Sequence, residues 1–150
     1  MPYFTAVLLR DGDKWSAQDV ELDDLGDLPE LADRLRLIEA GDEPVLVLVE
    51  REDDWWGVVR VDGDEDPRVF VSDAAASLAS PYGRFFETPA VSAAEDSPDG
   101  ACGGDFDVLN DLGTGPDELR QMCDDELLPM DALSQIAEAG GFAELLDSLR

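Results

Sequence analysis

The feature that most constrains the fold is an uninterrupted run of valine and leucine from Val45 to Val49, bounded by Pro44 and Glu50. The run is too short for a stable helix, so it predicts a β-strand. Because successive side chains of a strand point to opposite faces, a strand that is apolar on both faces has to be covered on both. The run therefore predicts the central strand of a sheet.

Other strand patterns surround this run. Residues Tyr3–Leu9 lead into a turn at residues 10–13, and a return strand is predicted over Lys14–Leu22. Two further strands are predicted at Trp55–Val61 and Arg68–Val71. These segments are rich in β-branched and aromatic residues, as strands are.

One segment between these strands has helical spacing. Residues Leu28–Ala40 follow a potential N-cap at Asp27 and precede Gly41. Their apolar side chains recur every three or four residues, at Leu28, Leu31, Leu35 and Ile38. The order β-β-α-β-β-β predicts an α+β fold over residues 1–80, with an antiparallel or mixed sheet and one packed helix.

The remainder of the chain differs in composition. Asp73 is expected to cap a short helix over Ala74–Leu78. Residues 81–104 are rich in proline, glycine, serine and acidic residues, which predicts a flexible linker. Residues 105–150 contain several short amphipathic patterns, which predict a helical C-terminal region. Such short helices need a packing partner to be stable.

The charge balance restricts the partners. The chain has 37 acidic and 10 basic residues and a formal charge of −27, spread evenly along its 150 residues. Such a surface repels phosphate backbones and anionic lipids, so we expect no direct binding to nucleic acid or membranes. Two interpretations stay open: the charge serves solubility or salt adaptation, or it meets a basic partner.

The residue inventory excludes several chemistries. The sequence has no histidine, so it lacks an imidazole base, a Ser-His or Cys-His nucleophile pair and histidine ligands for zinc. Cys102 and Cys123 are expected to be free thiols. Cys123 is expected to be buried, with its pKa raised by Asp124 and Asp125. We expect no catalytic residue, cofactor or metal ligand.

Acidic turns leave one enzymatic alternative. Asp62 and Asp64 resemble part of a calcium loop, but Pro67 would occupy the position that needs a glycine. Asp11 and Asp13 follow the first predicted strand. A divalent-cation-dependent carboxylate enzyme would require these two turns to converge.

Apolar residues give a candidate surface for a protein partner. Trp55 and Trp56 are adjacent on a predicted strand, so one is expected in the core and the other on the outer face or under the helix. An exposed Trp55 would be an anchor of the kind found at interface centres. The last helix adds four apolar side chains to the candidate partner-binding set: Phe142, Leu145, Leu146 and Leu149.

Segments along nearly the whole chain resemble a known bacterial family. They include Trp56–Val61, Arg68–Asp73, Asp105–Gly113, Leu119–Cys123 and Leu127–Leu133, followed by Ile136–Glu138. In order and length they are similar to the tRNA adenosine deaminase-associated proteins. The resemblance implies an accessory role beside a deaminase whose tRNA-binding face must be basic. The chain itself lacks the zinc-binding His and Cys set of that deaminase.

The sequence thus predicts a non-enzymatic acidic accessory protein that regulates or stabilises a basic RNA-modifying enzyme. The alternative is a homo-oligomeric structural protein, such as a homodimer, whose charge serves only solubility. We expect a cytoplasmic location, because no apolar run approaches the about 20 residues of a membrane span and the N-terminus lacks the pattern of a signal peptide.

Overall fold

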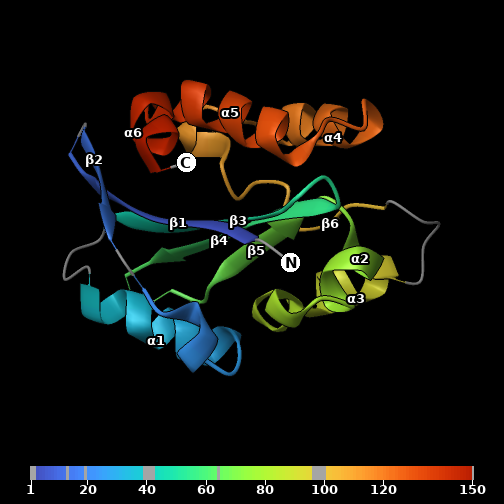
Figure 1. Cartoon of the computed structure of the whole chain (residues 1–150), viewed down its shortest axis with the longest axis horizontal. Helices are drawn as coiled ribbons and strands as arrows, with labels where there is room; N and C mark the ends of the chain where they lie inside the picture. The colour runs from blue at the N-terminus through green and yellow to red at the C-terminus, as the bar shows by residue number, and fades with distance from the viewer. Residues whose placement is uncertain are drawn as a thin grey trace.

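An antiparallel sheet forms the middle layer of the protein (Figure 1). The computed structural model describes residues 3–12, 14–18, 20–38, 43–63, 65–95 and 101–149. The strands are β1 (Tyr3–Asp11), β2 (Lys14–Gln18), β3 (Pro44–Arg51), β4 (Trp55–Asp62), β5 (Arg68–Val71) and β6 (Gly103–Gly104). Their order in the sheet is β2-β1-β3-β4-β5-β6, and every neighbouring pair is antiparallel. The predicted α+β class is confirmed.

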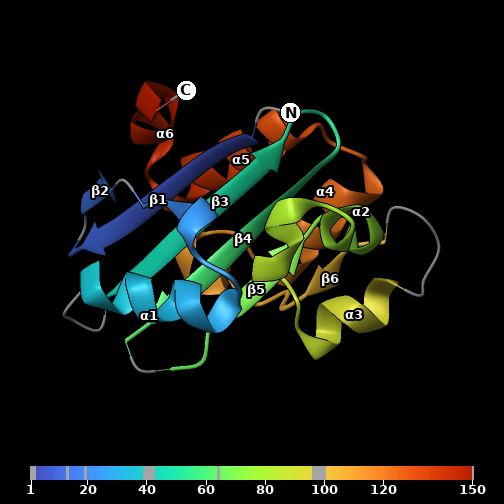
Figure 2. The same cartoon turned by 60° about the horizontal axis from the view of Figure 1, so that its bottom comes forward.

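Helices cover both faces of this sheet (Figures 1 and 2). One face carries α1 (Leu28–Ile38), α2 (Ala74–Leu78) and α3 (Pro89–Glu95), together with the short 3₁₀ helices η1 (Leu22–Asp24) and η2 (Pro81–Phe85). The other carries η3 (Asn110–Leu112), α4 (Pro116–Asp124), α5 (Pro129–Gly140) and α6 (Ala143–Leu149). The sheet therefore has a helical layer on each side, and the predicted helical C-terminal region forms one of the two layers. No helix among the described residues is both long and apolar enough to cross a bilayer.

The run of valine and leucine forms part of β3, an interior strand of the sheet, as its composition predicts. All five side chains from Val45 to Val49 are buried. Val45, Val47 and Val49 belong to the core beneath α1, whereas Leu46 and Leu48 belong to the core beneath α5. Because the strand faces alternate, this one segment supplies both cores.

Residues 81–95 are ordered parts of the α1 layer, which corrects the expectation of a flexible linker. Phe85, Phe86 and Val91 are fully buried against the sheet. Gly103 and Gly104 then pair with β5 as an edge strand. A Cβ atom at Gly104 would lie 2.3 Å from the carbonyl oxygen of Val69, so this glycine permits a close approach of two backbones. Residues 96–100 lie outside the described residues.

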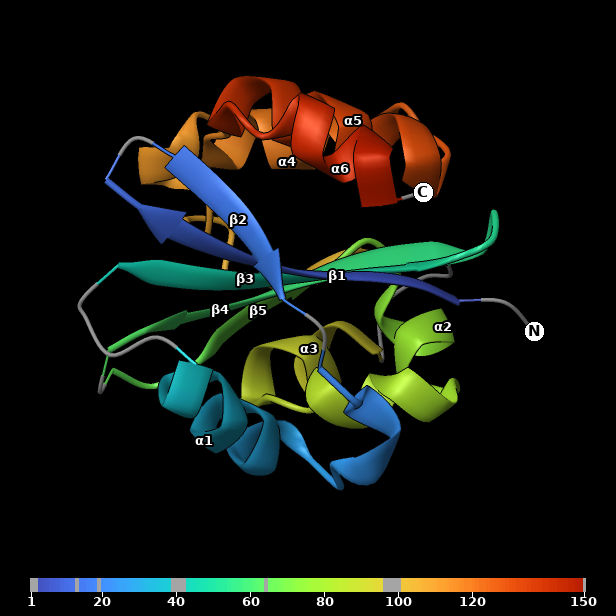
Figure 3. The ribbon, with the colours of Figure 1, turned by 60° about the vertical axis from the view of Figure 1, so that its left-hand side comes forward.

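Strand β2 bends from the sheet toward the C-terminal helices (Figure 3). It is shorter than the predicted Lys14–Leu22 strand, because Leu22 instead begins η1 and is buried beside α1. The Trp15 ring packs on Phe142 with 4.8 Å between ring centroids, and its indole N–H donates to the carbonyl of Gly140 at 3.0 Å. The first hairpin is thereby joined to the turn between α5 and α6.

Candidate functional site

The structure places most of the sequence-predicted partner residues inside the chain's own core. Trp55, a candidate partner anchor if it were exposed, has an exposed fraction of 0%, so it is not available to a partner. Its indole N–H donates to the Ser80 hydroxyl at 2.9 Å, and its ring meets Phe86 edge-on. Trp56 is also buried, against Phe70 on the opposite face. Helices on both faces bury both tryptophans, so neither projects from the surface as an anchor.

The last helix uses its apolar side within the chain as well. Phe142 and Leu146 are buried in the core between the sheet and α5. Leu145 is half-buried and packs against the same core, and Leu149 is 40% exposed. A helix as short as α6 needs such a surface to be stable, and this sheet provides it. Leu145 and Leu149 are the members of the predicted set that keep some accessible surface.

Of the four carboxylates considered for a divalent cation, the structure describes the side chain of Asp62 alone. Asp62 instead accepts hydrogen bonds from Arg60 at 2.9 Å and from Arg68 at 3.1 Å. Asp13 and Asp64 lie outside the described residues, as does the side chain of Asp11. The part of the chain that the structure describes contains no group of three or more potential metal ligands.

Arg60 is a buried cation that joins the sheet to the C-terminal region. Only 5% of its side chain is exposed, and its guanidinium donates to the carbonyl of Val108 at 2.8 Å and to Asp111 at 2.9 Å. The hydrogen bonds from Arg60 hold the pKa of the Asp111 carboxyl below its usual value. This cluster is structural, because its charges satisfy one another.

A pocket of about 250 Å³ opens at the N-terminal end of β4, away from Arg60. Its wall combines residues from the β3–β4 turn, the end of β5, α4 and the α4–α5 turn. The apolar part includes Trp56, Met122, Leu127 and Pro129. Of the described residues, four carboxylates and no basic side chain line it: Asp53, Asp54, Asp73 and Glu126. One of the four, Asp54, is paired with Arg51 at 3.1 Å. We call this feature the acidic pocket.

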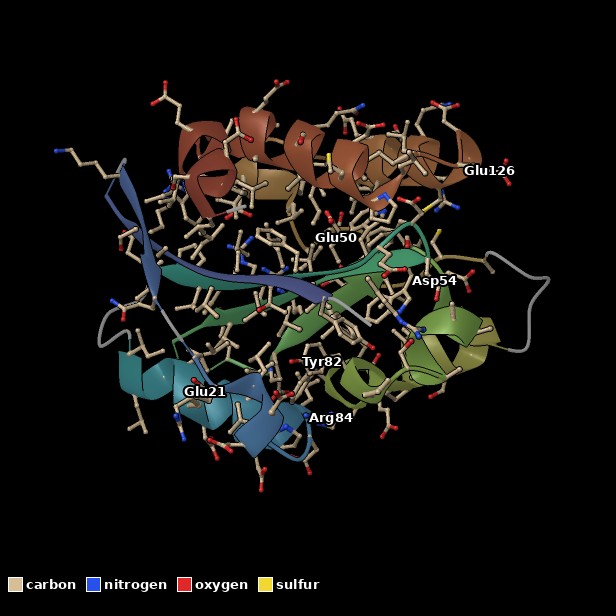
Figure 4. All side chains as sticks on the ribbon, viewed as in Figure 1. Glu21, Glu50, Asp54, Tyr82, Arg84 and Glu126 are labelled. Carbon is tan, nitrogen blue, oxygen red and sulfur yellow. The ribbon has the colours of Figure 1, made fainter. Side chains whose placement is uncertain are left out.

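Local backbone structure sets each carboxylate in place. Asp53 and Asp54 lie in the tight β3–β4 turn, where the N–H of Asp54 donates to the carbonyl of Arg51 at 2.9 Å. Asp73 caps α2 and accepts from the N–H of Ala76 at 3.0 Å. Glu126 has a positive φ of 53°, which turns the chain sharply between α4 and α5. Figure 4 shows Asp54 and Glu126 at the same end of the molecule, on the sheet and on the helical layer respectively.

Two large apolar side chains are exposed beside this pocket. Leu128 is 50% exposed and itself lines the pocket, and Met130 is 54% exposed. Both flank Pro129, which begins α5. We call these two side chains the apolar rim. Sequence reasoning missed this site, although the segment Leu127–Met130 contained a usable signal: apolar residues on either side of a helix-starting proline cannot all face the core.

A pair of thiols lies beside the acidic pocket. Cys123, on α4, lines the pocket, and Cys102 precedes β6. Both are free and half-buried. The influence of Cys102, more than that of Asp124, raises the pKa of Cys123, and the influence of Cys123 lowers the pKa of Cys102 to about 7. The predicted direction for Cys123 is confirmed, with a different main cause.

Comparison with protein families gives a match over almost the full length. Residues 3–143 match the family described as Rv3753c-like tRNA adenosine deaminase-associated protein. Comparisons with curated proteins and with solved structures found no significant match. The matched range includes every element that lines the acidic pocket. The chain therefore belongs to the Rv3753c-like tRNA adenosine deaminase-associated protein family.

Proposed function

We propose that this protein is a non-enzymatic accessory subunit that binds a tRNA adenosine deaminase through the acidic pocket and its apolar rim. Family membership supports an association with the deaminase. The choice of surface rests on the acidic pocket itself, where the described lining residues include four carboxylates, an apolar wall and no basic side chain.

Charge supports a basic partner segment at this pocket. An enzyme that binds tRNA must present arginine and lysine side chains to the phosphates. A chain with a formal charge of −27 attracts such a surface at long range, which speeds association and favours this partner over acidic proteins. A lysine or arginine side chain fits the pocket because its aliphatic stem can contact Trp56 and Met122 while its charge meets the carboxylates.

The apolar rim supports affinity beyond charge alone. Burial of apolar surface contributes about 25 cal/mol per Å², whereas exposed ion pairs contribute little. Leu128 and Met130 provide such surface directly beside the carboxylates. We propose that they pack on apolar residues of the deaminase, and that both proteins meet in the cytoplasm.

The experiment is calorimetric titration of the full chain with the purified tRNA adenosine deaminase of the same organism at low salt. The pocket variant carries Asp53→Lys and Glu126→Lys, two exposed positions on opposite walls. We expect a saturable complex for the natural sequence and a loss of affinity of at least about tenfold for this variant, because a basic segment would meet like charge.

A matched control distinguishes the effect of the pocket carboxylates on affinity from the effect of the overall charge. Glu65→Lys and Asp66→Lys change the formal charge equally, at exposed positions beyond the far end of β4. This variant should bind with affinity much closer to that of the natural sequence. Equal losses of affinity in the two variants would exclude the pocket as the docking site. If the natural sequence forms no complex with the deaminase, the proposed function is excluded.

A further inference from the structure

We infer that a groove between α4 and α5 is a second subsite, which takes a second basic side chain of the deaminase. The groove has a volume of about 260 Å³, close to that of the acidic pocket. We call this feature the interhelical groove. The docking surface of the deaminase then carries two neighbouring basic side chains rather than one, so the second subsite rests on the proposed function and deepens it.

The groove combines apolar and acidic groups. Met122 and Leu127 belong to its apolar part, and the carboxylates of Glu118 and Asp125 lie in its lining. The Gln121 amide donates to the Asp125 carboxylate at 2.9 Å, which holds that carboxylate beside the groove. Among the described residues, no basic side chain lines it. An arginine or lysine can therefore lay its aliphatic stem on the apolar part while its charge meets the carboxylates.

A buried hydroxyl in the groove also lacks a partner. Thr114 lines the groove and is only 2% exposed. Its backbone N–H donates to the carbonyl of Leu109 at 3.1 Å, whereas its hydroxyl makes no hydrogen bond within the described part of the chain. A buried polar group without a partner costs free energy, and a hydroxyl oxygen can accept a hydrogen bond from a guanidinium or ammonium group. A basic side chain in the groove would supply the missing partner.

The groove and the acidic pocket lie on two sides of α4. Gln121 lines the groove and Cys123 lines the pocket, whereas Met122 and Leu127 line both. Because a helix has 3.6 residues per turn, Gln121 and Cys123 point to nearly opposite sides of α4, with Met122 between them. A helix with its side chains is about 10 to 12 Å across, so two side chains of one partner surface can reach both sites.

The first test uses Nα-acetyl-arginine amide as the probe, titrated into the full isotope-labelled chain and followed by NMR. We expect saturable shifts of the backbone amide signals of Thr114, Gln121 and Asp125. Nα-acetyl-norleucine amide keeps an aliphatic stem without the charge and should give no saturable shift. Unchanged signals with the arginine probe, or equal shifts with the norleucine probe, would overturn the assignment of the groove to a basic side chain.

Thr114→Val removes the hydroxyl while keeping the shape of the side chain. The variant should bind the arginine probe in the groove at least about threefold more weakly, because one hydrogen bond is lost. The shifts of signals from the acidic pocket should keep their natural midpoint. The thermal unfolding midpoint should not fall, since the hydroxyl has no partner in the folded chain. An unchanged probe affinity in the groove would overturn the role of Thr114.

The second test is calorimetric titration of the deaminase with the Glu118→Gln and Asp125→Asn variant. We expect a roughly fivefold loss of affinity, because two carboxylates lose their charge. Asp117→Asn and Asp124→Asn form the matched control, since both are exposed on α4 and line neither site. The control should bind within about twofold of the natural sequence.

The results distinguish the second subsite from the proposed function. If the groove variant binds as tightly as its control while the acidic-pocket variant loses affinity, the groove is excluded and the proposed function stands. If the natural sequence forms no complex with the deaminase, the proposed function fails. The probe titration does not involve the deaminase, so it decides separately whether the groove binds a basic side chain.

Discussion

At the residue scale, Arg60 shows how an acidic chain uses its few cations. The side chain lies in the interface between β4 and the C-terminal region, where it contacts Asp62, Asp111 and the Val108 carbonyl. A buried charge is tolerated only when it is paired and fully hydrogen-bonded, and these three partners meet that requirement. The residue therefore fixes the start of the C-terminal helical layer on the sheet.

Replacing Arg60 should destabilise the protein strongly. We expect Arg60→Met to lower the free energy of unfolding by roughly 2 to 4 kcal/mol, because Asp62 and the Val108 carbonyl lose a buried partner. Urea unfolding followed by circular dichroism measures the change. Arg68→Met is the control: its side chain is 36% exposed, so its loss should cost less than about 1 kcal/mol. Similar losses for both variants would contradict this account of Arg60.

Asp111 should make part of the stability depend on pH. Its folded-state pKa lies below the ordinary value of 3.8 because Arg60 donates to the carboxylate. The resulting stabilisation is present above the unfolded-state pKa and is lost as the pH falls through the folded-state pKa.

Asp111→Asn isolates this contribution. At neutral pH the natural protein should be more stable than the variant, and the difference should shrink below about pH 4. Urea midpoints at a series of pH values test this expectation. A difference that stays constant down to the lowest pH would show that the carboxylate charge is not involved.

The sequence predicted which residues are buried better than it predicted which residues are exposed. The tryptophan pair illustrates the reason. Strand alternation correctly predicts that Trp55 and Trp56 lie on opposite faces of the sheet. Both are buried because a helical layer covers each face. The pairing of Arg60 with Asp111 could not be predicted from the sequence either, because the two residues are 51 positions apart and no local pattern connects them.

At the scale of elements, local periodicity was sufficient where helices and strands are regular. The β3 strand and α1 follow directly from the valine run and the leucine spacing. Residues 81–95 and 103–104 were wrongly predicted to be flexible, because glycine, proline and alanine signal flexibility unless tertiary contacts fix them. Here those small residues permit close packing of η2, α3 and β6, which only the folded chain reveals.

Gly83 should be the most restrictive of these small residues. A Cβ atom there would lie 1.9 Å from the carbonyl oxygen of Ser77, so η2 and α2 would have to separate. We expect Gly83→Ala to cost at least about 3 kcal/mol of unfolding free energy.

Gly141→Ala is the matched control for this substitution. Gly141 has a φ of 83°, but a methyl group added there would meet no atom within 4 Å, so only backbone strain of about 1 kcal/mol is expected. Thermal or urea unfolding distinguishes the two effects. A Gly83→Ala protein as stable as the Gly141→Ala protein would contradict the close packing of η2 on α2.

At the scale of the whole molecule, the formal charge of −27 makes the folded state repel itself. The acidic residues are distributed along the entire chain, so folding brings like charges together everywhere on the surface. Salt screens this repulsion over a distance of about 8 to 10 Å at moderate ionic strength. Stability and partner binding should therefore respond to salt in opposite directions.

Added sodium chloride should raise the midpoint of thermal unfolding. We expect the increase to be smaller in the Glu65→Lys and Asp66→Lys variant, whose charge is −27 + 4 = −23. Differential scanning calorimetry at several salt concentrations, with sucrose as an uncharged comparison, measures both effects. A midpoint that is independent of salt would show that the acidic surface carries little repulsive cost.

The central claim, that the acidic pocket and its apolar rim are the surface for the deaminase, is tested most directly by hydrogen–deuterium exchange of the chain alone and in excess deaminase. Exchange should slow around Asp53 in the β3–β4 turn and around Glu126 to Met130 in the α4–α5 turn, while the β4–β5 turn near Glu65 should be unaffected. Unchanged exchange in both pocket turns, or protection confined to another surface, would contradict the account.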